Sequence, residues 1–165
     1  GNSGASGTAR ELKGVRSAIT TNVITAATGS TTAALSLTNL NLLLKTIWAA
    51  GGKPNAIYVN GSQKEAVSAF STPITRNIDA STKRYTNVVN VFDSAYGTLD
   101  VVLDRYATTS ELLALQEDQF KVAYLRPVMV SPLPDDGGGK KGVAEVEYTL
   151  EYGNEAASGK LTNLS

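Results

Sequence analysis

The sequence contains neither histidine nor cysteine. Without these residues the chain cannot form a Ser-His-Asp or Cys-His catalytic centre, a disulfide, or a metal site with thiolate or imidazole ligands. Its 15 basic residues are balanced by 15 acidic residues, so the basic excess that is typical of charge-driven nucleic-acid binding is missing. No apolar run approaches the roughly 18 residues that a membrane-spanning helix requires.

Charge is also scarce, at 18% of residues compared with about 25% in an average soluble domain. Serine, threonine and asparagine together supply 43 of the 165 residues. A surface of this kind costs little to desolvate, and the cores of protein interfaces are depleted in charge. The composition therefore favours a structural or assembly protein over a freely diffusing enzyme, and the length is sufficient for one domain with a real core.

The N-terminal region is predicted to have little regular structure. Residues 1–9 are flexible by composition, and from Arg10 a short apolar helical face follows, formed by Leu12, Val15 and Ile19. The threonine-rich residues 20–35 are expected to form an extended or irregular connector, because β-branched side chains disfavour helix.

A helix, a strand and a second helix are predicted over residues 38–50, 56–59 and 62–70. Ser36 or Thr38 can cap the first helix, and the glycines at 51–52 end it. Its apolar stripe is expected to pack against a sheet that contains Ile57 and Val59. The stripe comprises Leu40, Leu44, Ile47 and Trp48.

The remainder of the chain is predicted to be mainly β-structure. After a polar loop at residues 71–86, strands are expected at 88–92, 99–103 and 112–115. Residues 120–133 and 140–152 are expected to pair as an antiparallel hairpin, with an irregularity at Pro127. The second hairpin strand alternates clearly, with Val146, Tyr148 and Leu150 predicted to face the domain core and Glu145, Glu147 and Glu151 to face outward.

Several motifs are compatible with chemistry but have a simpler interpretation. Gly137, Gly139 and Gly142 match the dinucleotide-binding spacing, but a strand follows instead of the required helix, which indicates a hairpin turn. The three glutamates of the hairpin strand can perform acid–base work or bind a cation. The simpler interpretation pairs them with Lys121 and Arg126 on the preceding strand.

The other candidate functional residues also have a simpler structural interpretation. The basic loop with Arg76, Lys83, Arg84 and Tyr85 can contact phosphate, but such loops are more often solvated or in contact with a neighbouring subunit. Asp93, Asp100 and Asp104 are predicted to be strand-end and surface residues. Lys13 and Ser17 lie four residues apart on the predicted helix, a spacing that a Ser-Lys nucleophile would permit but that often arises by chance. We therefore expect no catalytic, cofactor-binding or metal-binding residue in this chain.

Four sequence blocks, taken in order, resemble the C-terminal portion of major capsid proteins of tailed bacteriophages and prophages. They are IWAAGGKP at 47–54 with IYVNGSQK at 57–64, YGTLDVVLDR at 96–105, KVAYLRP at 121–127, and EYTLE at 147–151 with NEAASG at 154–159. The segment RELKGVRSAITTN at 10–22 is similar to the one that precedes these blocks in the family. Family members also carry an N-terminal arm, an extended loop and a long helix, so we expect this chain to correspond to the C-terminal half of such a protein.

The resemblance implies a mixed α/β or α+β fold of the tailed-phage capsid type. An N-terminal connector with a short helix would occupy residues 1–35, and an axial-type α/β domain residues 36–119. A peripheral-type long β-hairpin with a C-terminal tail would occupy residues 120–165.

The resemblance also implies a function as a non-enzymatic head-shell subunit. Copies of the protein would assemble as pentamers and hexamers into an icosahedral shell around packaged double-stranded DNA, with scaffold, portal or decoration proteins as further partners. The shell would be part of the virion and would form in the cytoplasm of the bacterial host. No cofactor, membrane or small-molecule substrate is implied.

Three alternatives remain open from the sequence. A shell protein of a cellular nanocompartment shares the fold, and neighbouring portal, terminase and protease genes would distinguish a phage capsid from it. A small binding module would need an aromatic-lined pocket, for which one Trp and three Phe provide little material. A carboxylate-based hydrolase would need two acids with raised pKa values in one cleft.

Overall fold

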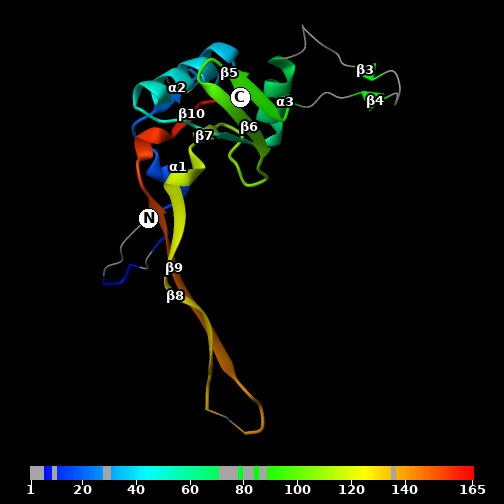
Figure 1. Ribbon diagram of the computed structural model, residues 1–165. Helices are drawn as coiled ribbons and strands as arrows, with labels where there is room; N and C mark the ends of the chain where they lie inside the picture. The colour runs from blue at the N-terminus through cyan, green and yellow to red at the C-terminus, as the bar shows by residue number, and fades with distance from the viewer. Residues whose placement is uncertain are drawn as a thin grey trace. The chain divides into compact units, whose positions relative to one another are not determined.

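The computed structural model describes residues 6–8, 11–27, 31–70, 78–79, 84–85, 89–134 and 137–165. The chain divides into two compact units, each built from segments that are distant in the sequence (Figure 1). Gly1–Ala18 and Phe120–Gly153 form the hairpin unit, and Ile19–Gln119 and Asn154–Ser165 form the sheet unit.

The sheet unit is organised around a six-stranded mixed sheet. Its strands are β1 (Val23–Thr25), β2 (Ala56–Val59), β5 (Val91–Ser94), β6 (Gly97–Leu103), β7 (Leu112–Leu115) and β10 (Gly159–Thr162). Their order across the sheet is β1-β10-β7-β2-β6-β5. The pairs β1–β10 and β2–β6 are parallel, and the other neighbours are antiparallel. The helices are α2 (Leu37–Ala49) and α3 (Gly61–Phe70), with short 3₁₀ turns η1 (Glu117–Gln119) and η2 (Glu155–Ala157).

Helix α2 is confirmed, together with both of its predicted ends. The Ser36 hydroxyl accepts a hydrogen bond from the backbone N–H of Asn39 at 3.2 Å, which satisfies one of the free N–H groups of the first turn. Gly51 ends the helix with φ +84°, a conformation that glycine adopts without strain. Strand β2 and helix α3 also lie where the sequence predicts them.

The core of the sheet unit lies between α2, α3 and one face of the sheet. Leu40, Leu43, Leu44 and Ile47 of α2 are fully buried and belong to the same cluster as Ile57 and Val59 of β2. Strand β10 approaches α2 closely at Gly159, where an added Cβ atom would lie 2.8 Å from Leu43 Cδ1. The predicted packing of the α2 stripe is therefore confirmed for Leu40, Leu44 and Ile47.

The prediction that Trp48 is buried with this stripe is wrong. The Trp48 side chain is 64% exposed. At 100° per residue it lies about 90° around the helix from the centre of the buried stripe, which places it at the margin of the apolar face.

The two ends of the chain differ from the sequence-based predictions. The helix expected from Arg10 is reduced to one turn, α1 (Val15–Ala18), and Leu12 is exposed. The connector predicted at 20–35 contains strand β1, which pairs in parallel with β10. The region expected to form a C-terminal tail supplies β10 itself, an inner strand of the sheet with Leu161 fully buried.

The loop predicted at 71–86 falls largely outside the described residues, and Arg76 and Lys83 lie in the part that is not described. Within it, β3 (Ile78–Asp79) and β4 (Arg84–Tyr85) form a short antiparallel pair. No helix in the described part of the chain has the length and apolar character needed to span a bilayer.

The hairpin unit consists mainly of β8 (Phe120–Pro132) and β9 (Gly142–Tyr152), drawn in Figure 1 as a long two-stranded ribbon. The two strands pair antiparallel, as predicted. The register shifts between Tyr124 and Arg126 and again between Arg126 and Met129, which confirms the irregularity expected around Pro127.

Candidate functional site

The hairpin has one apolar, aromatic face. The register pairs Phe120 with Tyr152, Val122 with Leu150 and Tyr124 with Tyr148, so all six side chains project from the same side of the ribbon. The rings of Tyr124 and Tyr148 lie 6.1 Å apart, centroid to centroid, at an interplanar angle of 45°. This arrangement falls in the range that aromatic pairs prefer.

Most of this apolar face is exposed to solvent. The exposed fraction is 61% for Tyr124 and 53% for Tyr148, and Val146 is exposed as well. The prediction that these residues face the domain core is therefore wrong for Val146 and Tyr148, whereas Leu150, on the same face, is partly buried. The alternation of residues defines which side of a strand is apolar, but it does not identify what covers that side.

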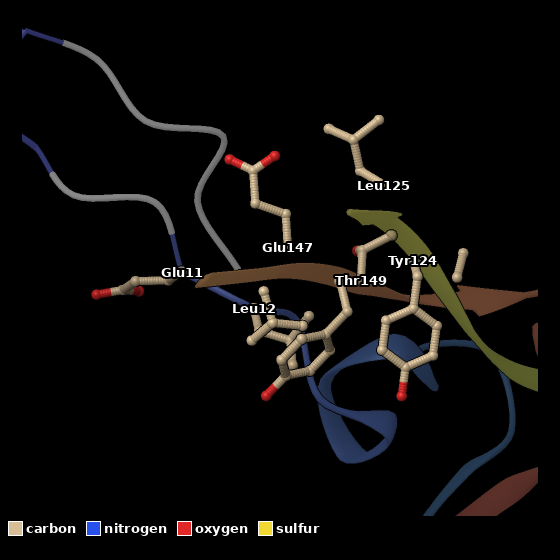
Figure 2. A pocket seen from close by; sticks show the side chains of 9 residues that line it. Glu11, Leu12, Tyr124, Leu125, Glu147 and Thr149 are labelled. Atoms are coloured by element: carbon tan, nitrogen blue, oxygen red, sulfur yellow. The ribbon is translucent and has the colours of Figure 1, made fainter. Parts of the chain in front are cut away.

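The N-terminal segment of the same unit borders a cavity of ≈ 710 Å³ on the hairpin. Leu12, Tyr124, Val146 and Tyr148 contribute apolar and aromatic lining. Figure 2 shows Leu12 and the Tyr124 ring on one side of the strands, with Leu125 and Glu147 on the other. The Nζ atom of Lys13 donates a hydrogen bond to the Tyr152 hydroxyl at 3.4 Å and lies 5.3 Å from the centroid of that ring. Lys13 therefore contacts Tyr152, whereas the sequence had suggested Ser17 as a possible partner.

The opposite face of the hairpin carries the glutamates. The Arg126 guanidinium lies 3.2 Å from Glu147 and 3.9 Å from Glu145, and Lys121 is in register with Glu151. These are the cross-strand pairs expected from the sequence. Exposed ion pairs of this kind contribute about 0–1 kcal/mol to stability. Within the described ranges, no group of three or more acidic residues is placed to hold a metal ion.

The remaining sequence candidates lie in turns and strands. Gly137 and Gly138 have φ values of +72° and +101°, which suits a hairpin turn, and β9 begins at Gly142 where a dinucleotide site would need a helix. Asp93 and Asp100 lie within β5 and β6, and Asp104 Oδ1 accepts a hydrogen bond from the backbone N–H of Tyr106 at 2.9 Å. Asp104 thus closes the turn that follows β6.

Among the described residues of the sheet unit, three titratable groups that were not identified from the sequence have perturbed environments. The Tyr58 hydroxyl donates to Glu117 at 2.6 Å, and this bond together with burial raises the pKa of Tyr58 to about 12. Burial lowers the pKa of Lys64, whose Nζ donates to the Val101 carbonyl at 2.6 Å. Hydrogen bonds from Thr20 and Thr21 lower the pKa of Glu155 to about 2. None of these groups has a periodic signal in the sequence, because each partner comes from a distant segment.

The chain matches the family model of the SU10 major capsid protein over residues 1–165. It belongs to that family. The family match favours a capsid protein over the nanocompartment shell protein that the sequence left open. No curated protein matches the chain.

A solved encapsulin structure supports the fold independently. The SrpI encapsulin of Synechococcus elongatus PCC 7942 matches with a TM-score of 0.53 at 12% identity, over 92% of this chain and 56% of that chain. A virus-like particle from Pyrococcus furiosus matches with a TM-score of 0.43 at 11% identity, over 89% of this chain and 58% of that chain. This member of the capsid family has a mixed α+β fold similar to that of the encapsulin. It spans between half and two thirds of the length of these two chains.

Proposed function

We propose that this chain functions as a head-shell subunit that assembles with its own copies into an icosahedral shell enclosing double-stranded DNA. The proposal rests on its membership of the SU10 major capsid protein family. The structural observation that carries it is the exposed apolar face of the hairpin, with Tyr124 61% and Tyr148 53% exposed. An apolar surface of this kind is typical of a site of protein–protein contact.

Within this proposal, the two units have different roles. The sheet unit acts as the axial part, which meets its copies at the centres of pentamers and hexamers. The hairpin unit acts as the peripheral part, whose apolar face contacts neighbouring copies. This assignment follows the domain division proposed from the sequence for residues 36–119 and 120–153. It departs from that division in two places: Asn154–Ser165 joins the sheet unit through β10, and the connector proposed at 1–35 divides after Ala18 between the hairpin unit and the sheet unit.

The proposed role is structural and not enzymatic. The ion-paired glutamates of the hairpin and the absence of histidine and cysteine are consistent with this role. Scaffold, portal and decoration proteins are proposed as further partners, and non-specific contact with packaged DNA is proposed as well. Assembly in the cytoplasm of a bacterial host would precede the mature virion.

Electron microscopy of the complete gene product that contains these 165 residues tests the proposal. We expect closed icosahedral shells. A variant with Tyr124→Ser and Tyr148→Ser should remain soluble and folded yet fail to form shells, because the hairpin face loses its aromatic contacts. A Tyr106→Ser variant is the matched control, since Tyr106 is a 92% exposed tyrosine that does not belong to the apolar face of the hairpin. A folded product that stays monomeric at every concentration would contradict the proposal.

A further inference from the structure

Strand β5 lies at one end of the six-stranded sheet. In the described part of the chain, the strand order gives it a neighbour, β6, on one side only. Its pairing with β6 continues without a bulge from Val91 to Ser94, and it contains no proline. Natural sheets often protect an end strand with a bulge, a proline or a cover, because its unpaired N–H and C=O groups bind other strands. Here the strand is short, which limits any added strand to a similar length.

The register shows which backbone groups lie on the free edge of β5. The N–H of Val101 donates to the carbonyl of Asn90 at 2.7 Å, so this pair is bonded across β5 and β6. Bonded and non-bonded pairs alternate in an antiparallel ladder. Phe92 therefore directs its backbone groups toward β6, whereas Val91 and Asp93 direct theirs away from it. The free edge offers the N–H and C=O groups of both residues, as the addition of a strand requires.

A cleft of ≈ 450 Å³ lies beside this edge, between the first half of α2 and the β5–β6 turn. Leu37, Phe92 and Tyr96 supply its apolar lining, and Asn41 supplies a polar group. Phe92 projects toward the face that the helices cover, since its cross-strand partner Leu99 is buried in the core. On an added strand, a side chain in register with Phe92 would project toward the same face and enter the cleft.

The wall of the cleft is preformed. The Ser94 hydroxyl donates to the Gly97 carbonyl at 3.1 Å and accepts from the N–H of Tyr96 at 3.2 Å, which closes the β5–β6 turn. The Tyr96 ring also contacts the indole ring of Trp48 on α2. A preformed site loses less conformational entropy when a partner binds than a site that must be ordered first.

The other side of the edge is acidic. Val91 is in register with Asp100, so both residues project, together with Asp93, from the face opposite to the helices. The two aspartates are exposed, and no described basic residue forms an ion pair with either of them. Opposite charges on neighbouring strands stabilise their pairing. The segment that complements this edge therefore has apolar side chains on one face and basic side chains on the other.

We propose that the free edge of β5 binds an extended segment of another protein in which apolar and basic residues alternate, so that this segment becomes an additional strand of the sheet. Main-chain hydrogen bonds to Val91 and Asp93 provide affinity, and alternate side chains provide specificity. A second copy of β5 fits less well, because antiparallel pairing of two such edges brings their Asp93 carboxylates together. The site belongs to the sheet unit and does not depend on shell assembly, so it can hold or fail independently of the proposed function.

Nuclear magnetic resonance titration of the complete 165-residue chain tests the proposal. The probe is a capped peptide of about eight residues in which valine and lysine alternate. We expect it to shift the amide signals of Val91 and Asp93 and to slow their hydrogen exchange about tenfold or more, because both N–H groups become paired. A peptide with glutamate in place of lysine should bind at least about tenfold more weakly. The same loss is expected for a lysine peptide whose edge-facing amides are N-methylated.

Reversing the charge at the edge tests the chemistry of the partner. Asp93→Lys should weaken binding of the lysine peptide about tenfold and strengthen binding of the glutamate peptide, a reciprocal change that a purely structural role of Asp93 would not produce. Asp118→Lys is the matched control, because it makes the same change at an exposed position in η1 that does not line the cleft. Both peptides should bind this variant as they bind the unmodified chain.

Several results would overturn the proposal. They are an absence of binding at about 1 mM lysine peptide, equal affinities for the lysine and glutamate peptides, and signal shifts on the apolar face of the hairpin instead of β5. Exchange at Val91 and Asp93 that slows with protein concentration in the absence of peptide would assign the edge to a second copy and would overturn it as well. If Asp93→Lys unfolds the chain, the N-methylated peptide decides, since it leaves the protein unaltered, and undiminished binding of that peptide would exclude strand addition.

Discussion

The indole ring of Trp48 lies 6.2 Å from the ring of Tyr96, centroid to centroid, at an interplanar angle of 48°. This pair joins the last turn of α2 to the β5–β6 turn at the surface of the sheet unit. The Trp48 side chain is 64% exposed, so the pair lies over the core and not inside it. Aromatic pairs of this geometry contribute about 0.5–1.5 kcal/mol beyond the area that they bury.

Replacing Trp48 should therefore cost little stability. We expect Trp48→Ala to lower the free energy of unfolding by about 1 kcal/mol, well below the 3–5 kcal/mol typical of a buried aromatic side chain. Leu44→Ala, on the buried side of the same helix, should cost about 2–5 kcal/mol. Urea denaturation of both variants checks the difference. Equal losses would show that Trp48 carries as much of the packing as the buried stripe does.

Local sequence signals predicted the elements whose ends and faces depend on nearby residues. Ser36, the glycines at 51–52 and the period of the buried leucines defined α2 to within one residue. The alternation at 143–152 defined the two faces of β9, and the register then paired Arg126 with Glu147 as expected. These features succeed because capping, helical period and strand alternation are all local.

The features that the sequence did not predict depend on distant pairing. Strand β1 is three residues long and pairs with β10, more than 130 residues later in the chain. Neither strand has a strong periodic signal, because each is too short to show one. The exposure of the hairpin face was missed for a similar reason: whether an apolar face is covered depends on which other segment or copy lies against it.

A second prediction concerns the close approach of α2 and η2. Gly52→Ala should destabilise the chain by about 1–3 kcal/mol, as expected for overpacking, since its Cβ atom would lie 2.6 Å from the Ala157 Cα atom and 2.7 Å from the Ala157 carbonyl oxygen. Gly61→Ala is the matched control, because a Cβ atom there meets nothing within 4 Å at the start of α3. Thermal denaturation of both variants provides the measurement. A neutral Gly52→Ala would show that η2 shifts freely away from α2.

A third prediction concerns the dependence of stability on pH. The pKa of Glu155 is lowered from 4.5 to about 2 by its hydrogen bonds to Thr20 and Thr21. A lowered pKa in the folded state means that the stabilising contribution is complete above the unfolded value of 4.5 and is lost as the pH falls toward 2. Glutamine does not titrate, so the difference in free energy of unfolding between the unmodified chain and Glu155→Gln should be constant above pH 5 and shrink between pH 4.5 and about 2.

Urea denaturation at a series of pH values measures this difference. Glu151→Gln serves as the control, since Glu151 lies on the exposed side of β9. A difference for Glu155→Gln that is the same at pH 2.5 and pH 6 would show that the charge of the carboxylate does not strengthen its hydrogen bonds to Thr20 and Thr21.

The last prediction separates folding from assembly on the two faces of the hairpin. If Tyr148 were buried, Tyr148→Asp would place an unpaired charge in the core and unfold the chain. Because Tyr148 is 53% exposed, we expect this substitution to change the melting temperature of the 165-residue chain only slightly. Glu147→Lys should also change it little, since the Arg126–Glu147 ion pair is exposed on the opposite face.

The two variants should differ from the control variant in shell formation and not in the melting temperature of the 165-residue chain. In the complete gene product, Tyr148→Asp should prevent shell formation, because it places a charge in the apolar contact face and interface cores exclude charge. Glu147→Lys should impair shell formation through unfavourable charge contacts with the neighbouring copy. Tyr106→Asp, on the 92% exposed Tyr106 of the sheet unit, is the control that should assemble normally. Sedimentation and electron microscopy measure the formation of shells. If the Tyr148→Asp variant of the 165-residue chain unfolded, the apolar face would be covered within the chain and would not be free to contact another copy.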